Sequence, residues 1–426
     1  MELLKTIKPG DVTTTRTDPV DTATIDGARA ILSDVRARGD IAVREHAERL
    51  GDLEAGAPLT LGVGELNAAL ESLDAGDAAH LQAANDGIRA FAEGQRSSLG
   101  AFSMRVPGTE CGRMGHELAP VERAGCYAPG GRYPLPSSVL MTVATARAAG
   151  VGTVWVASPR PAPVTLAAAA IAGADGLLAV GGAQAIGAMV YGCGPIEAVD
   201  AVVGPGNRWV TAAKQLVAGR VAIDMLAGPS EVLVIADGSA DAGTLAADLL
   251  AQAEHDDDAA CYLVTTEAGL IERVNAELET QLADLPTAAT ARNALGNSFA
   301  VLCSTLDEAV SVSDALAPEH LEIQTADARG VAARCKHYGA IFIGAGAAEA
   351  VGDYGVGPNH TLPTGGTARG FAGLSVMTFM RVRTFIDMPE AGPGELYRRT
   401  AALARLEGLE AHARSAERRA GGVNRA

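Results

Sequence analysis

The sequence predicts an α/β protein with two doubly wound, incomplete Rossmann-like parallel-sheet domains, an N-terminal arm and a helical C-terminal tail. Short apolar runs of strand length alternate with longer helix-like runs through the middle and last thirds of the chain. Apolar residues are largely small, and aromatic residues make up only 4% of the chain, which suits closely packed helix and sheet layers. The 426 residues suffice for two or three domains.

The first part of the chain is expected to be mainly helical. After a polar arm at residues 1–24, residues 22–50 place apolar side chains on one helix face, which predicts a helix. A second helix is expected at 78–95. Residues 101–120 alternate in polarity and carry charge, which is typical of a β-hairpin.

Residues 127–229 form the first alternating α/β series. The expected strands lie in VGTVWVASP, GLLAVGG and AVDAVVGPGN. The expected helices lie in SSVLMTVATARAAG, PVTLAAAAIAGA and RWVTAAKQLVAG. The first of these helices should end at Gly150, because glycine readily adopts the left-handed conformation that follows a helix.

A second alternating series begins with EVLVIAD and continues through the strands CYLVTT, AVLCST and AIFIG. Helices are expected between them at 245–255, 270–285 and 306–316, and a charged amphipathic helix at 396–419. The predicted division of the chain is an arm (1–24), a main domain carrying the zinc and catalytic residues (25–126 with 230–374), a second domain (127–229) and a tail (375–426).

Composition excludes several classes of protein. The net charge of −17 argues against nucleic acid and anionic membranes as partners. The N-terminus lacks a basic segment followed by an apolar core, and the most apolar region, 166–191, is interrupted by Asp175 and glycines. The six cysteines form no CxxC pair, which argues against a thiolate zinc site or a disulfide framework. A cytoplasmic protein is therefore expected.

The stretch LLAQAEHDDDAAC suggests a metal site at a helix end. Gln252 and His255 are three residues apart and share one helix face. Together with Asp353 and His412 they offer two nitrogen and two oxygen ligands, a set that suits zinc. The amide is a weak ligand, so such a site should be labile and should tolerate other divalent ions. The alternative is a solvated acidic helix end, as charge runs usually are.

The pair Glu319–His320 is a candidate general base, because histidine titrates near neutral pH and the carboxylate can orient its proton. Pro318 before it indicates a sharp loop that aims both side chains. The alternative is a structural pair in which His320 caps a helix.

Dinucleotide binding is weakly indicated. GAG at 344–346 lacks the third glycine of the usual fingerprint. Glycine turns at 128–131, 181–188 and 204–207 follow expected strands, and strand ends of a doubly wound sheet are where ligands bind. Each turn is equally explained as a tight turn without a ligand; the set of three suggests a nucleotide.

Eight motifs occur together in one order. They are GCYAPGGRYPLPSSVLM, GGAQAIGA, VGPGNRWVTAAK, IDMLAGPSEVLVIAD, LLAQAEHD, APEHLEI, GDYGVGPNHTLPTGG and LARLEGLEAH. With them the chain resembles the histidinol dehydrogenase family from about residue 20 to residue 415.

The resemblance implies a zinc-dependent, NAD-linked enzyme that oxidises L-histidinol through the aldehyde to L-histidine, the last steps of histidine biosynthesis. It implies one zinc per subunit, with the ligands Gln252, His255, Asp353 and His412. It implies proton transfer by Glu319 and His320. The implied substrate contacts are Ser230, His360 and Glu407, together with His320 and the four zinc ligands. The implied NAD contacts are Tyr127, Gln184 and Asn207. It also implies a homodimer in which Glu407 and His412 are supplied by the partner subunit.

The implied mechanism assigns two proton-transfer roles. His320 takes the alcohol proton as a hydride passes to NAD, and Glu319 then activates a water that attacks the bound aldehyde before the second hydride transfer. Only the resemblance favours NAD over NADP.

Two other functions remain open. One is a dehydrogenase of the same family for another polar alcohol such as a sulfonated diol. That substrate has no amine for Glu407 to bind, and its sulfonate would be expected to pair with a cation such as Arg132 or Arg369. The other is a non-enzymatic zinc- or nucleotide-binding protein, which would be expected to lack Glu319 or His320.

Overall fold

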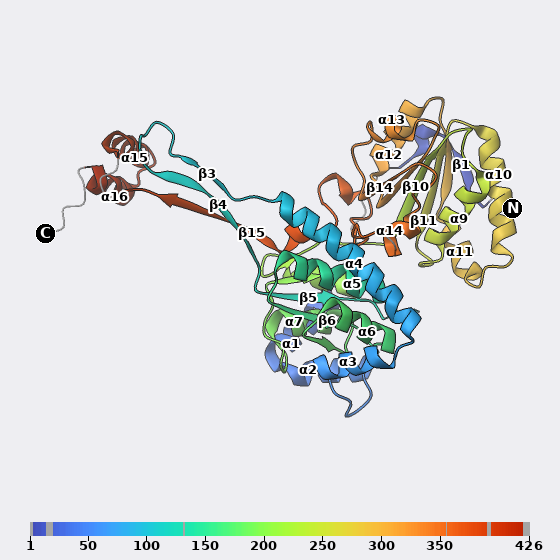
Figure 1. Ribbon diagram of the computed structural model, residues 1–426, viewed down its shortest axis with the longest axis horizontal. Coiled ribbons are helices and arrows are strands. Elements are labelled where there is room, and N and C mark those ends of the chain that lie inside the picture. Colours follow the sequence, from blue (N-terminus) through green and yellow to red (C-terminus); the bar gives the residue numbers. More distant parts are fainter. Residues whose placement is uncertain (1–2, 14–19, 131–132, 355, 390–392, 421–426) are drawn as a thin grey trace. The chain divides into compact units, whose positions relative to one another are not determined.

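The computed structural model describes residues 3–13, 20–130, 133–354, 356–389 and 393–420 (Figure 1). The chain divides into two compact units, which are described separately: Met1–Gln95 with Val121–Phe379, and Arg96–Pro120 with Met380–Ala426. In the part of the chain that the structure describes, no helix is long and apolar enough to cross a membrane.

The first unit contains two six-stranded sheets. The sheet that carries the candidate site, called sheet A, has the order β1-β12-β11-β10-β13-β14, and every strand pair in it is parallel. Its strands are β1 (Lys5–Ile7), β12 (Phe299–Leu302), β11 (Ala260–Thr265), β10 (Glu231–Ala236), β13 (His320–Gln324) and β14 (Ala340–Ile343). The N-terminal arm thus adds an edge strand, β1, to a sheet built mostly from residues after 230.

Helices cover both faces of sheet A (Figure 1). One face packs in a buried apolar cluster with α9 (Ala242–Ala253), α10 (Ala268–Leu282) and α11 (Ala288–Leu295). The other face packs with α12 (Leu306–Leu316) and α13 (Ala328–Ala332). The short helix α14 (Glu349–Tyr354) follows β14 and contacts α9. This double coverage explains why the strands of sheet A are nearly continuous apolar runs.

The second sheet, sheet B, has the order β2-β7-β6-β5-β8-β9 and is parallel except for the edge pair β2–β7. Its strands are β2 (Thr60–Gly62), β7 (Gly176–Leu178), β6 (Thr153–Ala157), β5 (Arg123–Tyr127), β8 (Ala201–Val203) and β9 (Ala222–Ile223). The connecting helices are α5 (Pro136–Ala149), α6 (Pro163–Ala172), α7 (Gly182–Tyr191) and α8 (Arg208–Val217). Helix α5 ends as predicted at Gly150, which is left-handed with φ 94°.

The N-terminal helices pack with sheet B, which differs from the predicted grouping of 25–126 with 230–374. Helices α1 (Thr22–Arg38) and α2 (Asp40–Leu50) contact α7, and α3 (Val63–Ser72) contacts α6. Apolar side chains of α1 and α2 share one buried cluster with those of α7 and α8. The predicted single helix at 22–50 is broken at Gly39, whose φ is 57°. Helix α4 (Ala75–Ser98) covers the second expected helix.

The second unit joins two distant parts of the sequence. Strands β3 (Phe102–Arg105) and β4 (Arg113–Pro120) form the predicted hairpin, and β15 (Met380–Asp387) pairs antiparallel with β4. The C-terminal helices α15 (Gly394–Leu406) and α16 (Glu410–Ala420) pack through buried alanines. The predicted single tail helix at 396–419 is interrupted by Gly408, which is left-handed with φ 75°. Within the described residues there are also three short 3-10 helices: Pro9–Asp11, Thr367–Arg369 and Val376–Phe379.

Candidate active site

The candidate site lies at the amino-end edge of sheet A. His320 and Glu231 are the first residues of the neighbouring strands β13 and β10. Helix α9 connects β10 to β11 and therefore returns to the same edge, where Gln252 and His255 lie at and after its last turn. Asp353 lies on α14, which contacts α9. Ligands of doubly wound sheets usually bind at the carboxyl edge, so this placement was not predictable from strand order.

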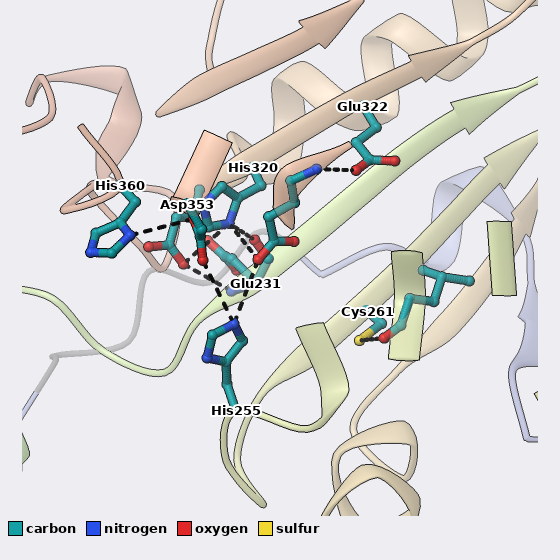
Figure 2. Close-up of polar contacts among 10 residues, drawn as sticks. Glu231, His255, Cys261, His320, Glu322, Asp353 and His360 are labelled. Atoms are coloured by element: carbon teal, nitrogen blue, oxygen red, sulfur yellow. Dashed lines mark hydrogen bonds and ion pairs between the residues drawn. The ribbon is translucent and has the colours of Figure 1, made fainter. Parts of the chain in front are cut away.

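One imidazole and two carboxylates form the candidate metal cluster. The ligand atoms of His255, Glu349 and Asp353 all lie within 4.8 Å of one another. His255 Nε2 lies 3.8 Å from Glu349 Oε1 and 4.0 Å from Asp353 Oδ2. On the other side, His360 Nδ1 lies 3.6 Å from Asp353 Oδ1. Figure 2 shows the rings of His255 and His360 directed toward Asp353 from different segments.

The fully buried Gln252 amide completes this cluster. With its nitrogen turned toward Glu349, the amide donates to both carboxylate oxygens at 3.1 and 3.2 Å. The opposite orientation faces the amide oxygen toward the same carboxylate, where a cation between them or a proton on the carboxyl would compensate the two acceptors. The side chain is thus placed either to pair with Glu349 or to share a metal with it.

The electrostatics of the cluster fit a divalent cation. Burial, together with repulsion from Asp353 and Glu319, raises the pKa of Glu349 well above its usual range. Burial acts most strongly on Asp353 and raises its pKa, but the hydrogen bond with His360 and the nearby imidazoles together outweigh burial and leave the pKa lowered. Among the described residues, the ion pairs of both carboxylates are made with histidines. Two buried carboxylates beside imidazoles, without a lysine or arginine partner, are a donor set that zinc accepts.

His320 is held in one tautomer by the main chain. Its Nδ1 lies 3.2 Å from the carbonyl oxygen of Glu231, which can only accept, so the proton sits on Nδ1. Nε2 then carries the lone pair, and this buried atom has no hydrogen-bond partner among the described residues. Burial lowers the pKa of His320 to about 4, so the ring is neutral at physiological pH. A buried, neutral imidazole with a free lone pair can accept a proton.

Glu319 is fixed by the backbone of the same residue, Glu231. Its Oε2 accepts a hydrogen bond from the Glu231 backbone N–H at 3.0 Å. Burial raises its pKa well above the usual range, and a hydrogen bond from Ser230 acts in the opposite direction. Glu319 Oε2 lies 3.8 Å from His320 Nδ1. The two side chains therefore form a buried pair at a strand start, and neither caps a helix.

The predicted nucleotide contacts lie at the carboxyl ends of sheet B. The hydroxyl of Tyr127, at the end of β5, accepts from the Gly182 N–H at 3.3 Å. Gln184 donates to Asp52 at 3.1 Å, while its buried Oε1 has no partner within the described residues. The Asn207 side chain caps α8 by accepting from two backbone N–H groups at 3.0 and 3.3 Å. The structure thus brings Tyr127 and Gln184 to one turn and gives Asn207 a structural contact.

Two predicted site residues lie in the second unit. Glu407 follows the last turn of α15 and His412 lies in the first turn of α16, on either side of Gly408. Both side chains are exposed. Of the two arginines relevant to a sulfonated substrate, Arg369 donates to the backbone carbonyls of Asp314 and Ala315. Arg132 lies outside the described residues.

Sequence reasoning missed Glu349 and Glu231. Glu349 precedes Asp353 by four residues, so the two face the same way on α14. That spacing was the available signal, although acidic pairs are also common on exposed helix surfaces. Glu231 contributes through its backbone, which has no sequence signature.

Fold and site together define an α/β protein of the doubly wound class with a buried acid–base pair beside a candidate metal cluster. The sequence model of the histidinol dehydrogenase family matches residues 14–420. The chain is 44% identical over 405 residues to the histidinol dehydrogenase of Aromatoleum aromaticum, covering 93% of this chain and 92% of the relative. It is 45% identical over 392 residues to that of Thermus thermophilus, covering 92% and 93%.

A solved structure has the same fold. The crystal structure of histidinol dehydrogenase from Elizabethkingia anophelis matches with a TM-score of 0.91 and 31% identity, covering 98% of each chain. The chain therefore belongs to the histidinol dehydrogenase family, and it is an oxidoreductase. The predicted fold class and the predicted family are both confirmed.

Proposed function

We propose that this protein oxidises L-histidinol to L-histidine in two successive NAD-linked steps, through the aldehyde. The observation that carries the proposal is His320, whose Nε2 lone pair is buried, neutral and free to accept a proton next to the metal cluster. An alcohol can lose a hydride only as its hydroxyl proton is removed, so such a base is the first requirement of the reaction.

One zinc ion per subunit is proposed to bind at Gln252, His255, Asp353 and His412. In support, the ligand atoms of His255, Glu349 and Asp353 in the first unit lie close enough together to bind one ion, and the Gln252 amide adjoins them. His412 and Glu407 are proposed to come from the partner subunit of a homodimer. When bound, zinc would hold the imidazole and amine of the substrate, because a nitrogen ligand suits it.

The residues of the chain then divide the proton transfers. His320 accepts the alcohol proton at Nε2, and its Nδ1–H stays on the Glu231 carbonyl, which stabilises the ring orientation. Glu319 activates the water that adds to the aldehyde, since its raised pKa makes its carboxylate a strong base once deprotonated. Ser230, His360 and Glu407 are proposed to contact the substrate.

NAD is proposed to bind at Tyr127, Gln184 and Asn207 and to accept the hydride of each step. The turns that carry these residues lie at the carboxyl ends of sheet B, where nucleotides bind in doubly wound folds. The unpaired Oε1 of Gln184 offers an acceptor for such a ligand.

The test is a stoichiometry. Purified, zinc-loaded protein is given L-histidinol and excess NAD, and NADH and histidine are counted per histidinol consumed. Two NADH and one histidine, with turnover lost in His320→Gln, support the proposal. Zinc binding without turnover of histidinol would refute the substrate, and sulfonated diols would then be assayed as the alternative.

A further inference from the structure

Strand β13 is unusual for an interior strand of a parallel sheet. All five of its residues, His320–Gln324, are buried, and strands buried on both faces are normally apolar throughout. Here polar and apolar residues alternate. Leu321 and Ile323 point to the apolar cluster beneath α12. His320, Glu322 and Gln324 therefore share the opposite face, which packs toward α9.

These polar residues form a network that ends on α14. Gln324 Nε2 donates to Asp248 Oδ2 at 2.7 Å and to Glu322 Oε2 at 3.1 Å. Glu322 Oε1 accepts a hydrogen bond from the backbone N–H of Glu349 at 2.9 Å. Figure 2 shows one dashed contact from the Glu322 carboxylate, on the side of Glu322 that faces His320. The network does not itself include a proposed zinc ligand.

The network nevertheless touches three elements that carry the site in the first unit, α9, β13 and α14. Asp248 lies one turn before Gln252 on α9. Glu322 lies two residues after His320 on β13, and Glu349 opens α14, on which Asp353 lies one turn later. Helix α14 has only six residues, so it cannot hold its own position by internal hydrogen bonds.

We propose that Glu322 is a positioning residue that holds the start of α14 against β13 and α9, and thereby sets the metal affinity of Asp353. The inference rests on the metal site of the proposed function. Partners behind a metal ligand tune affinity because they decide whether the ligand is already in place when the ion arrives. An apolar residue at 322 would fill the space, but it would leave the buried Glu349 N–H without its acceptor.

The experiment measures zinc affinity of the full-length, metal-depleted protein by competition with a chromophoric chelator. Glu322→Gln keeps an oxygen acceptor for the Glu349 N–H, whereas Glu322→Leu removes it. Glu322→Leu is expected to lose roughly 10- to 100-fold in affinity, and Glu322→Gln less than about 3-fold. The matched control is Glu308→Leu, because Glu308 also accepts a backbone hydrogen bond, from Ser304, but on α12.

Hydrogen exchange of α14 provides a second readout without metal. Faster exchange at 349–354 in Glu322→Leu, with rescue by Glu322→Gln, supports positioning. Equal zinc affinity and equal exchange in wild type and Glu322→Leu would overturn the proposal. If Glu322→Leu does not fold, Gln324→Leu is measured instead, and unchanged affinity and exchange there would also overturn it. Failure of the wild type to bind zinc would count against the proposed function first.

Discussion

Breaking the buried ion pair between Lys214 and Asp224 should destabilise sheet B strongly. Their side chains are only 3% and 0% exposed, and both hold Gly204, which follows β8. Lys214 Nζ donates to the Gly204 carbonyl at 3.0 Å, and Asp224 Oδ2 accepts from the Gly204 N–H at 2.7 Å. Lys214→Met keeps the apolar stem but leaves the buried Asp224 carboxylate without its counter-charge and the Gly204 carbonyl without this donor. Breaking such a pair costs about 3–5 kcal/mol.

The assay is thermal unfolding followed by circular dichroism. At roughly 2–4 °C per kcal/mol for a domain of this size, Lys214→Met should melt about 6–20 °C lower. Adding Asp224→Asn removes the unpaired charge and should restore part of the loss. Arg29→Met, which breaks an exposed pair with Asp26, is the control and should cost less than about 1 kcal/mol.

Two results would refute the reasoning. Melting of Lys214→Met within 2 °C of wild type, roughly the effect of 1 kcal/mol, would mean that the pair contributes nothing net. A double variant no more stable than the single one would mean that the lysine acts through packing alone. Because Gly204 begins the turn that ends at Asn207, a raised KM for NAD in Lys214→Met is also expected.

Three further outcomes are expected. Asp353→Asn should weaken zinc binding in equilibrium dialysis by about 100-fold or more, because a neutral amide replaces a carboxylate; unchanged affinity would exclude Asp353 as a ligand. Gly204→Ala should lower the free energy of unfolding in urea by about 2 kcal/mol or more, since its Cβ would lie 2.0 Å from the Tyr127 carbonyl oxygen at φ 114°. Gly346→Ala, where a Cβ meets nothing within 4 Å, is the control, and equal losses in the two would contradict the steric argument. Burial raises the pKa of Glu322 to about 8, so between about pH 4.5 and pH 8 the folded state holds a proton that the unfolded state releases. The free energy of unfolding of the metal-free protein should therefore fall as pH rises through that window, and by less in Glu322→Gln; parallel curves would count against this titration.

Periodicity predicted most of the fold. The alternating series of strands and helices after residue 120 appears in both sheets, because the local patterns agree with the layers that they build. The spacing of apolar residues does not reveal the positive φ angle of Gly39, which separates α1 from α2. The prediction of one helix at 22–50 was therefore wrong at this residue. Nor does this spacing predict pairing between distant segments, such as β1 with β12, whose partners lie almost 300 residues apart.

The candidate site was predicted unevenly for the same reason. Spacing placed Gln252 and His255 on one helix face, and the structure brings both to the cluster that contains Asp353. Glu349 was missed because its role depends on where α14 lies, which sequence spacing does not reveal. The roles of these residues, and that of His412 in the second unit, stay predictions.

The backbone of Glu231 has a consequence for how the site tolerates mutation. Its N–H binds Glu319 and its carbonyl binds the ring of His320, so the two proposed proton-transfer groups are spaced by main-chain atoms. Every amino acid supplies that carbonyl, and every one except proline supplies that N–H. A substitution of Glu231 can therefore remove the hydrogen bond between its side chain and the Gly365 N–H. It would leave the spacing of Glu319 and His320 intact. Selection for this geometry should conserve Glu319, His320 and the backbone course of β10 and β13. At position 231 it should exclude only proline.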